Sequence, residues 1–402
     1  MAPMTERPET GQQPASTNAF DPAIWLLAAI GFVAQIGISV MLPLLPLYAT
    51  ELGAPPIVLG LLTSSFAITN AIGQLGTGFL AERWGARRLM SAGLGLYAAM
   101  NALIATAATA GWLLAWRAAA GFGGGAMIVA ERIYVVEITA PARRAFANGI
   151  ISAGQSAGTV TGPVIGGFLA ASWGLRAPFI LVAATSLIAL VGTFFLRGRP
   201  HSQGASADQG PPEPIQYRPL ATLLAANLAL LATYGAFITT YAAMATTQLG
   251  WSTLEVGIAF SFFGAGSIIL GPALANLADR VGRRQVATIA PLALVGFGAG
   301  LVLGLPQPIV FGLAFLGGGG LTAFSASWYA LLADAAGQRR LGRTFGIVNA
   351  ASNVGIVIGA TMAAMLWARI DVSAGMMVGV VTPLIAVGAM LAFRPRAVPS
   401  EA

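Results

Sequence analysis

The chain has 402 residues, of which 56% are hydrophobic and only 9% are charged, whereas soluble proteins average about 25% charged residues. This composition excludes a soluble globular protein, a disordered chain and a DNA-binding domain, although the formal net charge is +7. The chain has no cysteine and a single histidine, His201, which excludes disulfides, thiol chemistry and a histidine metal cluster, so we expect no metal and no cofactor.

Twelve runs of mostly apolar residues follow one another along the chain, and each has about the length of 20 residues that a membrane crossing requires, or more. They lie at 24–48, 57–81, 89–109, 112–137, 146–171, 177–196, 220–247, 254–278, 286–304, 308–333, 344–368 and 374–393. Residues 1–22 are a polar tail that lacks the features of a cleaved signal peptide, and 197–219 is the one long polar segment between runs. The sequence therefore predicts an all-α membrane protein with six-helix bundles at 23–196 and 220–394, joined by a cytoplasmic linker and followed by a tail at 395–402.

The arginines predict the orientation of these spans in the membrane. All 21 basic residues are arginines. If the N-terminus is inside, only Arg176 and Arg369 fall outside, Arg117 and Arg132 lie within a span, and the other 17 are cytoplasmic. Because cytoplasmic loops carry an excess of positive charge, we expect a multi-pass protein of the cell (inner) membrane with both termini in the cytoplasm.

The two halves of the chain repeat each other. Residues 80–88 read LAERWGARR, and residues 277–285 read LADRVGRRQ, at an offset of 197 positions. The same offset maps Glu137 onto Asp334. Parallel six-span repeats with a binding site between them, near the midplane, are typical of one class of secondary transporter.

Three segments carry a resemblance to a known family. Residues 78–88 read GFLAERWGARR, with Glu82 at a usual Asp position and Ala86 at a usual basic one; residues 117–121 read RAAAG and residues 158–167 read GTVTGPVIGG. Together they resemble the major facilitator superfamily over nearly the whole chain, and especially its twelve-span drug:proton antiporters. The resemblance implies a non-enzymatic, monomeric carrier that works by alternating access. It implies export of a small amphiphilic or cationic organic molecule in exchange for protons, driven by the proton gradient, with no nucleic-acid partner.

The charged loop and its repeat are candidates for a latch that holds one state of the transport cycle together. Glycines in the loop permit close helix approach and a tight turn, and the arginines can pair with acids at the ends of other spans. The alternative is that these arginines only set the topology. The latch candidates are Gly78, Glu82, Arg83, Gly85, Arg87, Arg88, Glu137, Asp279, Arg280, Arg283 and Asp334.

The fifth run carries closely spaced glycines that lie on nearly one helix face, which lets another helix backbone approach. Pro163 removes one backbone hydrogen bond and favours a kink, whereas the second half has Ala360 at the equivalent position. The proline is interpreted as shaping the first half for directionality; the alternative is a proline that the membrane span merely tolerates. The residues of this motif are Gly158, Gly162, Pro163, Gly166 and Gly167.

The fourth run breaks the symmetry, because it carries three charged residues whose counterparts are uncharged. An ionisable group inside a span costs about 2.5–3.5 kcal/mol on insertion scales and usually faces a cavity or a partner. Glu131 is the only acid well inside a run, so we expect it to carry the proton, with Arg117 and Arg132 coupled to it. The alternatives are a permanent ion pair between Glu131 and Arg132, and an Arg117 that reaches the headgroups.

Aromatic and amide side chains are the candidate ligand contacts, because they suit an amphiphilic or cationic organic molecule. Lipid-facing belts and helix packing are the alternative for the aromatics. Uptake symport, uniport, lipid or metabolite transport, and a non-transporting receptor remain alternative functions. The candidates are Gln35, Gln155, Tyr234, Phe237, Tyr241, Phe324, Trp328, Tyr329 and Asn353.

Overall fold

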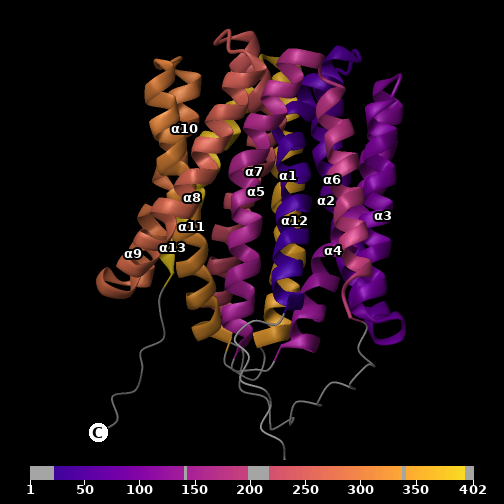
Figure 1. Ribbon diagram of the computed structural model, residues 1–402. Coiled ribbons are helices and arrows are strands. Elements are labelled where there is room, and N and C mark those ends of the chain that lie inside the picture. The colour runs from indigo at the N-terminus through magenta and orange to yellow at the C-terminus, as the bar shows by residue number, and fades with distance from the viewer. Residues whose placement is uncertain (1–21, 140–142, 198–216, 337–340, 394–402) are drawn as a thin grey trace, which may run out of the picture.

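The computed structural model describes residues 22–139, 143–197, 217–336 and 341–393, and within them the chain forms thirteen helices and no strand. Figure 1 shows the helices standing side by side, with the first half of the chain on one side and the second on the other. The first bundle contains α1 (Pro22–Glu51), α2 (Pro56–Trp84), α3 (Ala86–Ala105), α4 (Ala110–Ile138), α5 (Arg144–Trp173) and α6 (Ala177–Phe194). The second contains α7 (Tyr217–Thr247), α8 (Thr253–Val281), α9 (Arg283–Ile289), α10 (Leu292–Val302), α11 (Gln307–Ala336), α12 (Leu341–Arg369) and α13 (Val372–Ala392).

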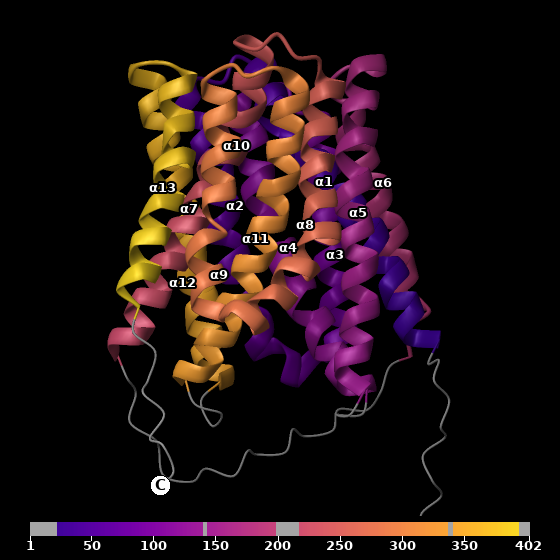
Figure 2. The ribbon, with the colours of Figure 1, turned by 90° about the vertical axis from the view of Figure 1, so that its left-hand side faces the viewer.

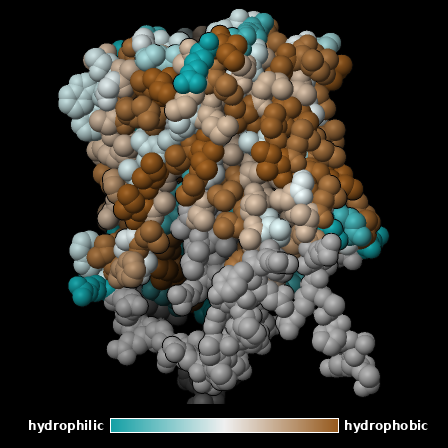
Figure 3. Space-filling view, turned by 180° about the vertical axis from the view of Figure 1, so that it is seen from behind, coloured by the Kyte–Doolittle hydropathy of each residue, from teal (hydrophilic) through white to brown (hydrophobic). Residues whose placement is uncertain are grey.

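Ten helical segments of the described chain are long and apolar enough to cross a membrane, with α9 and α10 together forming one of them. Apolar side chains cover much of the face seen in Figure 3. Helix α5 is not among the ten, and α12 contributes only the shorter apolar stretch Asn353–Arg369. Helix α5 is rich in glycine and hydroxyl side chains and packs between α1 and α8. The chain is a multi-span membrane protein.

The ninth predicted run, 286–304, is broken in the structure. Helix α9 ends at Ile289, and α10 begins at Leu292 with Pro291 as its N-cap. A proline has no backbone N–H and its ring clashes with the preceding turn, so it starts a helix far more readily than it continues one. The run predicted at 286–304 is still one candidate membrane span, and the two helices form it together.

The internal repeat is visible in the packing of each bundle. A Cβ atom added to Gly123 on α4 would lie 2.6 Å from the carbonyl oxygen of Gly93 on α3. At the same offset of 197, a Cβ atom on Gly320 of α11 would lie 2.6 Å from the carbonyl oxygen of Ala290. The same close backbone approach therefore occurs once in each half.

The two bundles meet along two seams, α5 against α8 and α2 against α12. The Pro163 carbonyl oxygen lies against Gly257, and the Ala360 carbonyl oxygen lies 2.8 Å from a Cβ built on Gly60, which is the same contact at the offset of 197. Both contacts lie toward the end of the molecule where α2 and α8 begin, which we call the closed end. The opposite end carries exposed arginines at the ends of α2 and α8, and we call it the arginine-rich end. Figure 2 gives a second view of the two bundles.

Candidate functional site

A central cavity of about 180 Å³ lies between the two bundles. Helices α1, α2, α3 and α4 line it from the first bundle, and α7 and α12 line it from the second. Its wall is mostly apolar. The polar residues are Thr63, Asn70, Tyr97, Arg117, Tyr234 and Asn353, and among the lining residues that the structure describes there is no Asp or Glu.

Arg117 is the only charged residue among the described lining residues of this cavity, and it is 4% exposed. Its Nη1 donates to the Met41 sulfur at 3.4 Å, and its guanidinium carbon lies 3.7 Å from the ring centre of Phe66. Its Nε has no hydrogen-bond partner among the described residues. Arg117 is therefore buried in the protein, which excludes the alternative in which it reaches the lipid headgroups.

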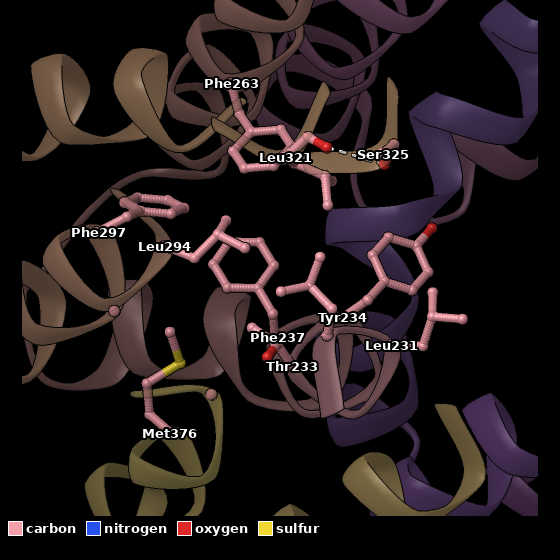
Figure 4. A pocket seen from close by; sticks show the side chains of 13 residues that line it. Leu231, Thr233, Tyr234, Phe237, Phe263, Leu294, Phe297, Leu321, Ser325 and Met376 are labelled. Atoms are coloured by element: carbon pink, nitrogen blue, oxygen red, sulfur yellow. Dashed lines mark hydrogen bonds between the residues drawn. The ribbon is translucent and has the colours of Figure 1, made fainter. Parts of the chain in front are cut away.

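A second pocket of about 250 Å³ lies inside the second bundle, between α7, α8, α10, α11 and α13. Figure 4 shows the rings of Phe237, Phe263 and Phe297 around it, with Met376 at one side. The hydroxyls of Thr233 and Ser325, which also line it, donate to the carbonyl oxygens of their own helices. The pocket is apolar. We call it the C-terminal pocket.

Tyr234 on α7 lines both the central cavity and the C-terminal pocket. In Figure 4 its hydroxyl points away from Phe237, toward the ribbon of the first bundle. The guanidinium of Arg117 is close enough to interact electrostatically with the hydroxyls of Tyr97 and Tyr234. One side chain thus separates an apolar chamber from a chamber that holds a positive charge.

Glu131 lies on the same helix as Arg117 but in a different place. Fourteen residues of α-helix place the two about 21 Å apart along the axis, and Glu131 does not line the central cavity. It is half-buried, and its Oε1 accepts a hydrogen bond of 2.9 Å from Nε2 of Gln155 on α5. Gln155 in turn packs against Gly31 of α1. Arg132, the next residue, is exposed.

The other expected ligand contacts are distributed over packing and surface. Tyr241, Phe324 and Trp328 are each 1% exposed, and they belong to the hydrophobic cores of the second bundle. The Tyr241 hydroxyl donates to the Val256 carbonyl oxygen at 2.9 Å. None of these three lines either pocket, because helix packing buries each ring completely. Of the aromatic candidates, Tyr234 and Phe237 line these two pockets.

The remaining polar and aromatic candidates differ in their surroundings. Asn353 lines the central cavity. Tyr329 is 43% exposed on the surface. Gln35 donates to the Ser39 hydroxyl at 3.2 Å, lies beside Gly158 where α1 packs on α5, and lines neither of these two pockets.

The loop arginines bind helix ends in a repeated pattern. Arg87 Nη2 donates to the carbonyl oxygen of Phe194 at the end of α6, at 3.3 Å. Arg284 Nη2 donates to the carbonyl oxygen of Leu391 near the end of α13, at 2.8 Å. Both donors and both acceptors are 197 positions apart. Each arginine satisfies a carbonyl that lacks an intrahelical partner, at the negative end of the helix dipole.

The acids and glycines of the latch candidates fall into distinct positions. Arg283 forms an exposed ion pair with Asp334 at 3.4 Å, whereas Ala86 occupies the position of Arg283 in the first half. Gly85 connects α2 to α3 with a φ of +76°, a conformation that favours glycine. Gly78 has open space around it, so it provides no close helix approach. Arg83, Arg88 and Arg280 are exposed, Glu137 lies in the last turn of α4, and the side chains of Glu82 and Asp279 lie outside the described residues.

The glycine–proline motif of α5 packs against two different helices. Cβ atoms on Gly158 and Gly162 would lie 2.6 and 2.8 Å from carbonyl oxygens of α1, and Gly166 packs against Val40 on the same helix. A Cβ on Gly167 would lie 2.5 Å from the Thr253 carbonyl oxygen of α8. Together with the Pro163 contact to Gly257, this places the motif both within the first bundle and in the seam between bundles.

Several residues of the central cavity were missed from the sequence. Asn70 and Tyr97 line it from α2 and α3, and Phe66 and Met41 contact the Arg117 guanidinium. The only available signal was Asn70, a polar residue within a predicted span. A phenylalanine and a methionine in apolar helices carry no sequence signal that distinguishes a guanidinium contact from ordinary core packing.

The comparisons with known proteins agree with this architecture. The sequence profile of the Major Facilitator Superfamily matches residues 27–228 and again 222–402. The chain belongs to this superfamily of membrane transporters. Among solved structures, the nucleoside transporter NupG superposes with a TM-score of 0.74 over 93% of this chain and 98% of its own, at 14% identity. A bacterial homologue of the lysosomal transporter Spinster, in an inward-facing unoccupied conformation, gives 0.67 over 92% and 93%, at 16% identity. These two likenesses describe the fold alone.

Curated relatives match over shorter regions. Multidrug resistance protein 2 of Bacillus subtilis is 29% identical over 165 residues, which is 41% of each chain. Quinolone resistance protein NorA of Staphylococcus aureus is 28% identical over 178 residues, 44% of this chain and 46% of its own. Multidrug resistance protein MdtG of Klebsiella pneumoniae is 33% identical over 171 residues, 41% of each. The chain thus matches less than half the length of these relatives.

Proposed function

We propose that the protein is a secondary active transporter that exports a small drug-like organic molecule in exchange for protons, by alternating access. Its arginine-rich end faces the cytoplasm, as the positive-inside rule predicts, and it acts as a monomer in the cell (inner) membrane. Curated relatives named for multidrug and quinolone resistance support the choice of cargo. The cavity between two repeated bundles supports the transport mode.

The proposed proton coupling rests on one observation, the hydrogen bond between Glu131 and Gln155. A glutamine amide can both donate and accept a hydrogen bond. Gln155 can therefore donate to the carboxylate, and after a flip of its amide it can accept from the carboxylic acid. An arginine in the same place could only donate, which would hold the acid in its charged form. The partner of Glu131 is compatible with both protonation states, as a proton carrier needs.

Alternating access follows from the two seams. The contacts of Gly60 with Ala360 and of Gly257 with Pro163, which join the two bundles, lie toward the closed end. If the bundles rock about the central cavity, these seams must open while contacts form near the arginine-rich end. Glu131 lies seven residues, or about 10 Å, from the arginine-rich end of α4. Opening and closing of that end would therefore change the access of water to Glu131. Proton binding there and ligand binding in the cavity are then linked through the bundle motion.

The test is proton movement in liposomes that contain the purified protein. A quinolone and the dye ethidium serve as probes, and a pH-sensitive dye inside the liposomes reports the proton flux that each probe causes. We expect wild-type protein to move protons with at least one probe and Glu131→Gln to abolish this flux. Exchange of probe for probe should survive, because it requires no proton. Glu51→Gln, which removes an exposed acid at the closed end of α1, is the matched control.

Two outcomes would contradict the proposal. Wild-type proton flux in the Glu131→Gln variant would mean that Glu131 is structural and that another acid carries the proton. Probe movement in wild-type protein that is insensitive to a pH gradient would indicate a uniporter, which is the alternative function.

A further inference from the structure

Arg117 is a buried charge, and no carboxylate of the described lining residues of the cavity serves as its counter-ion. Its side chain is 4% exposed and contacts a methionine sulfur and a phenylalanine ring, with the phenols of Tyr97 and Tyr234 nearby. Its Nε has no hydrogen-bond partner among the described residues. A buried charged donor without a hydrogen-bond acceptor is costly, and sulfur is a weak acceptor. The unpaired Nε of Arg117 is explained if a molecule that enters the cavity supplies a hydrogen-bond acceptor for it.

The charge of Arg117 also selects against one class of ligand. No carboxylate is among the described lining residues of the cavity, so no negative charge among them neutralises the guanidinium. Charges interact more strongly inside a protein than in water, and a cationic group in this cavity would be repelled by the guanidinium. An anionic or strongly accepting group would be attracted. The phenol groups of Tyr97 and Tyr234, which lie near the guanidinium, can add hydrogen bonds to such a group.

The C-terminal pocket has the opposite chemistry. Three phenylalanine rings, those of Phe237, Phe263 and Phe297, surround it (Figure 4). Its two aliphatic hydroxyl groups, those of Thr233 and Ser325, already donate to backbone carbonyls. It therefore suits an apolar ring and offers little to a polar group.

We propose that the two chambers form one site, which binds an amphiphile with an acidic or other strongly accepting head at Arg117 and an apolar ring body in the C-terminal pocket. Tyr234 lines both chambers and lies where head and body would join. This inference rests on the proposed function, because it names the class of cargo. It narrows the amphiphilic or cationic ligand expected from the sequence to an amphiphile with an accepting head. With volumes of about 180 and 250 Å³, the chambers together fall within the range of roughly 300–1,000 Å³ typical of small-molecule sites.

The experiment measures equilibrium binding of three matched probes to the purified protein in nanodiscs, without any gradient. The probes share a naphthalene ring and differ in the head: 2-naphthoate, 2-naphthamide and 2-naphthylmethylammonium. We expect the carboxylate to bind most tightly and the ammonium most weakly. A hydrogen bond to a charged group contributes enough to change affinity by about 10- to 100-fold, so Arg117→Gln should weaken naphthoate binding by that factor and affect the amide less. Arg369→Gln, an exposed arginine at the end of α12, is the control.

A second pair of variants tests the apolar chamber. Ser325→Phe places a ring in the C-terminal pocket and should weaken all three probes together. Ala326→Phe adds the same ring at the next residue of α11, which is exposed, and should leave binding unchanged. If Arg117→Gln does not fold, the order of the affinities of the three probes for wild-type protein still tests the inference.

The outcomes separate this inference from the proposed function. Ammonium binding as tight as that of the carboxylate, an equal effect of Arg117→Gln on all three probes, or no saturable naphthoate binding would overturn the inference. Binding with the expected order in a protein whose probe transport ignores the pH gradient would refute proton coupling and leave the inference standing.

Discussion

The seams between the bundles give the sharpest mechanical prediction. A Cβ atom on Gly60 would lie 2.5 Å from Cβ of Ala364 and 2.8 Å from the carbonyl oxygen of Ala360. Non-bonded carbon atoms are optimally about 3.5–4.0 Å apart, so Gly60→Ala must separate α2 from α12 by roughly 1 Å. Overpacking of this kind costs about 1–3 kcal/mol, which lowers the ratio of closed to open seams roughly 5- to 150-fold.

The native chain contains no cysteine, so introduced cysteines can report on the seam without background. The hydroxyl oxygens of Ser64 and Thr361 lie 3.2 Å apart across α2 and α12. We expect the pair Ser64→Cys with Thr361→Cys to form a disulfide under mild oxidant, and Gly60→Ala to slow its formation at least several-fold. Gly76→Ala on the same helix, which has nothing within 4 Å of the added atom, should leave the rate unchanged.

The second seam turns this assay into a test of rigid-body motion. Gly257 lies against the Pro163 carbonyl oxygen in the seam between α5 and α8, far in sequence from both cysteines. If the bundles rock as units, Gly257→Ala should slow disulfide formation between α2 and α12 as well. Cross-linking rates that stay at the native value in both alanine variants would refute the argument that these contacts hold the closed end together.

Three further results follow from individual contacts. Trp328→Phe removes a 2.7 Å hydrogen bond from the indole to the buried Leu223 carbonyl oxygen. The loss should lower the stability by about 1–3 kcal/mol, measured as a lower Tm. Trp112→Phe, at a residue 55% exposed, is the control and should change the Tm little. Arg87→Ala frees the end of α6 and should slow transport of a bound probe more than it weakens equilibrium binding; a weaker affinity with an unchanged rate would contradict this. Arg283→Gln breaks an exposed ion pair and should lower the stability by no more than about 1 kcal/mol; a large fall in Tm would contradict the surface role.

The sequence was sufficient to predict the architecture because a membrane-spanning chain can adopt few backbone structures. A chain that must satisfy its backbone hydrogen bonds in lipid forms helices, so long apolar runs identify the spans directly. The repeat at an offset of 197 then predicts how the halves correspond, and the arginine bonds of α3 and α9 preserve that offset atom for atom. The break at Pro291 was missed because hydropathy continues across it and only the backbone changes.

The site was less predictable because sequence periodicity shows which residues share a helix face but not what that face contacts. Tyr234, Phe237 and Tyr241 share one face of α7, as expected from their spacing, yet Tyr241 does not join the first two in lining the C-terminal pocket. Tyr241 lies deeper in the packed core, where its hydroxyl reaches a neighbouring helix. Glu131 and Gln155 were both singled out, but in different roles, because no pattern in the sequence indicates that residues 24 positions apart on separate helices are hydrogen-bonded.

One pair of equivalent positions explains how a duplicated framework acquires chemistry. Glu131 and Trp328 are 197 positions apart and occupy the same place in α4 and α11. Trp328 is 1% exposed and donates to a backbone carbonyl. This hydrogen bond satisfies the indole in one protonation state, and the side chain does not bind a further proton. Glu131 is half-buried and is bonded to a side-chain amide, an arrangement that can be satisfied with or without a proton. The shared backbone positions hold both bundles in the same form, so a change at one such position can introduce a titratable group while its counterpart keeps the second bundle packed.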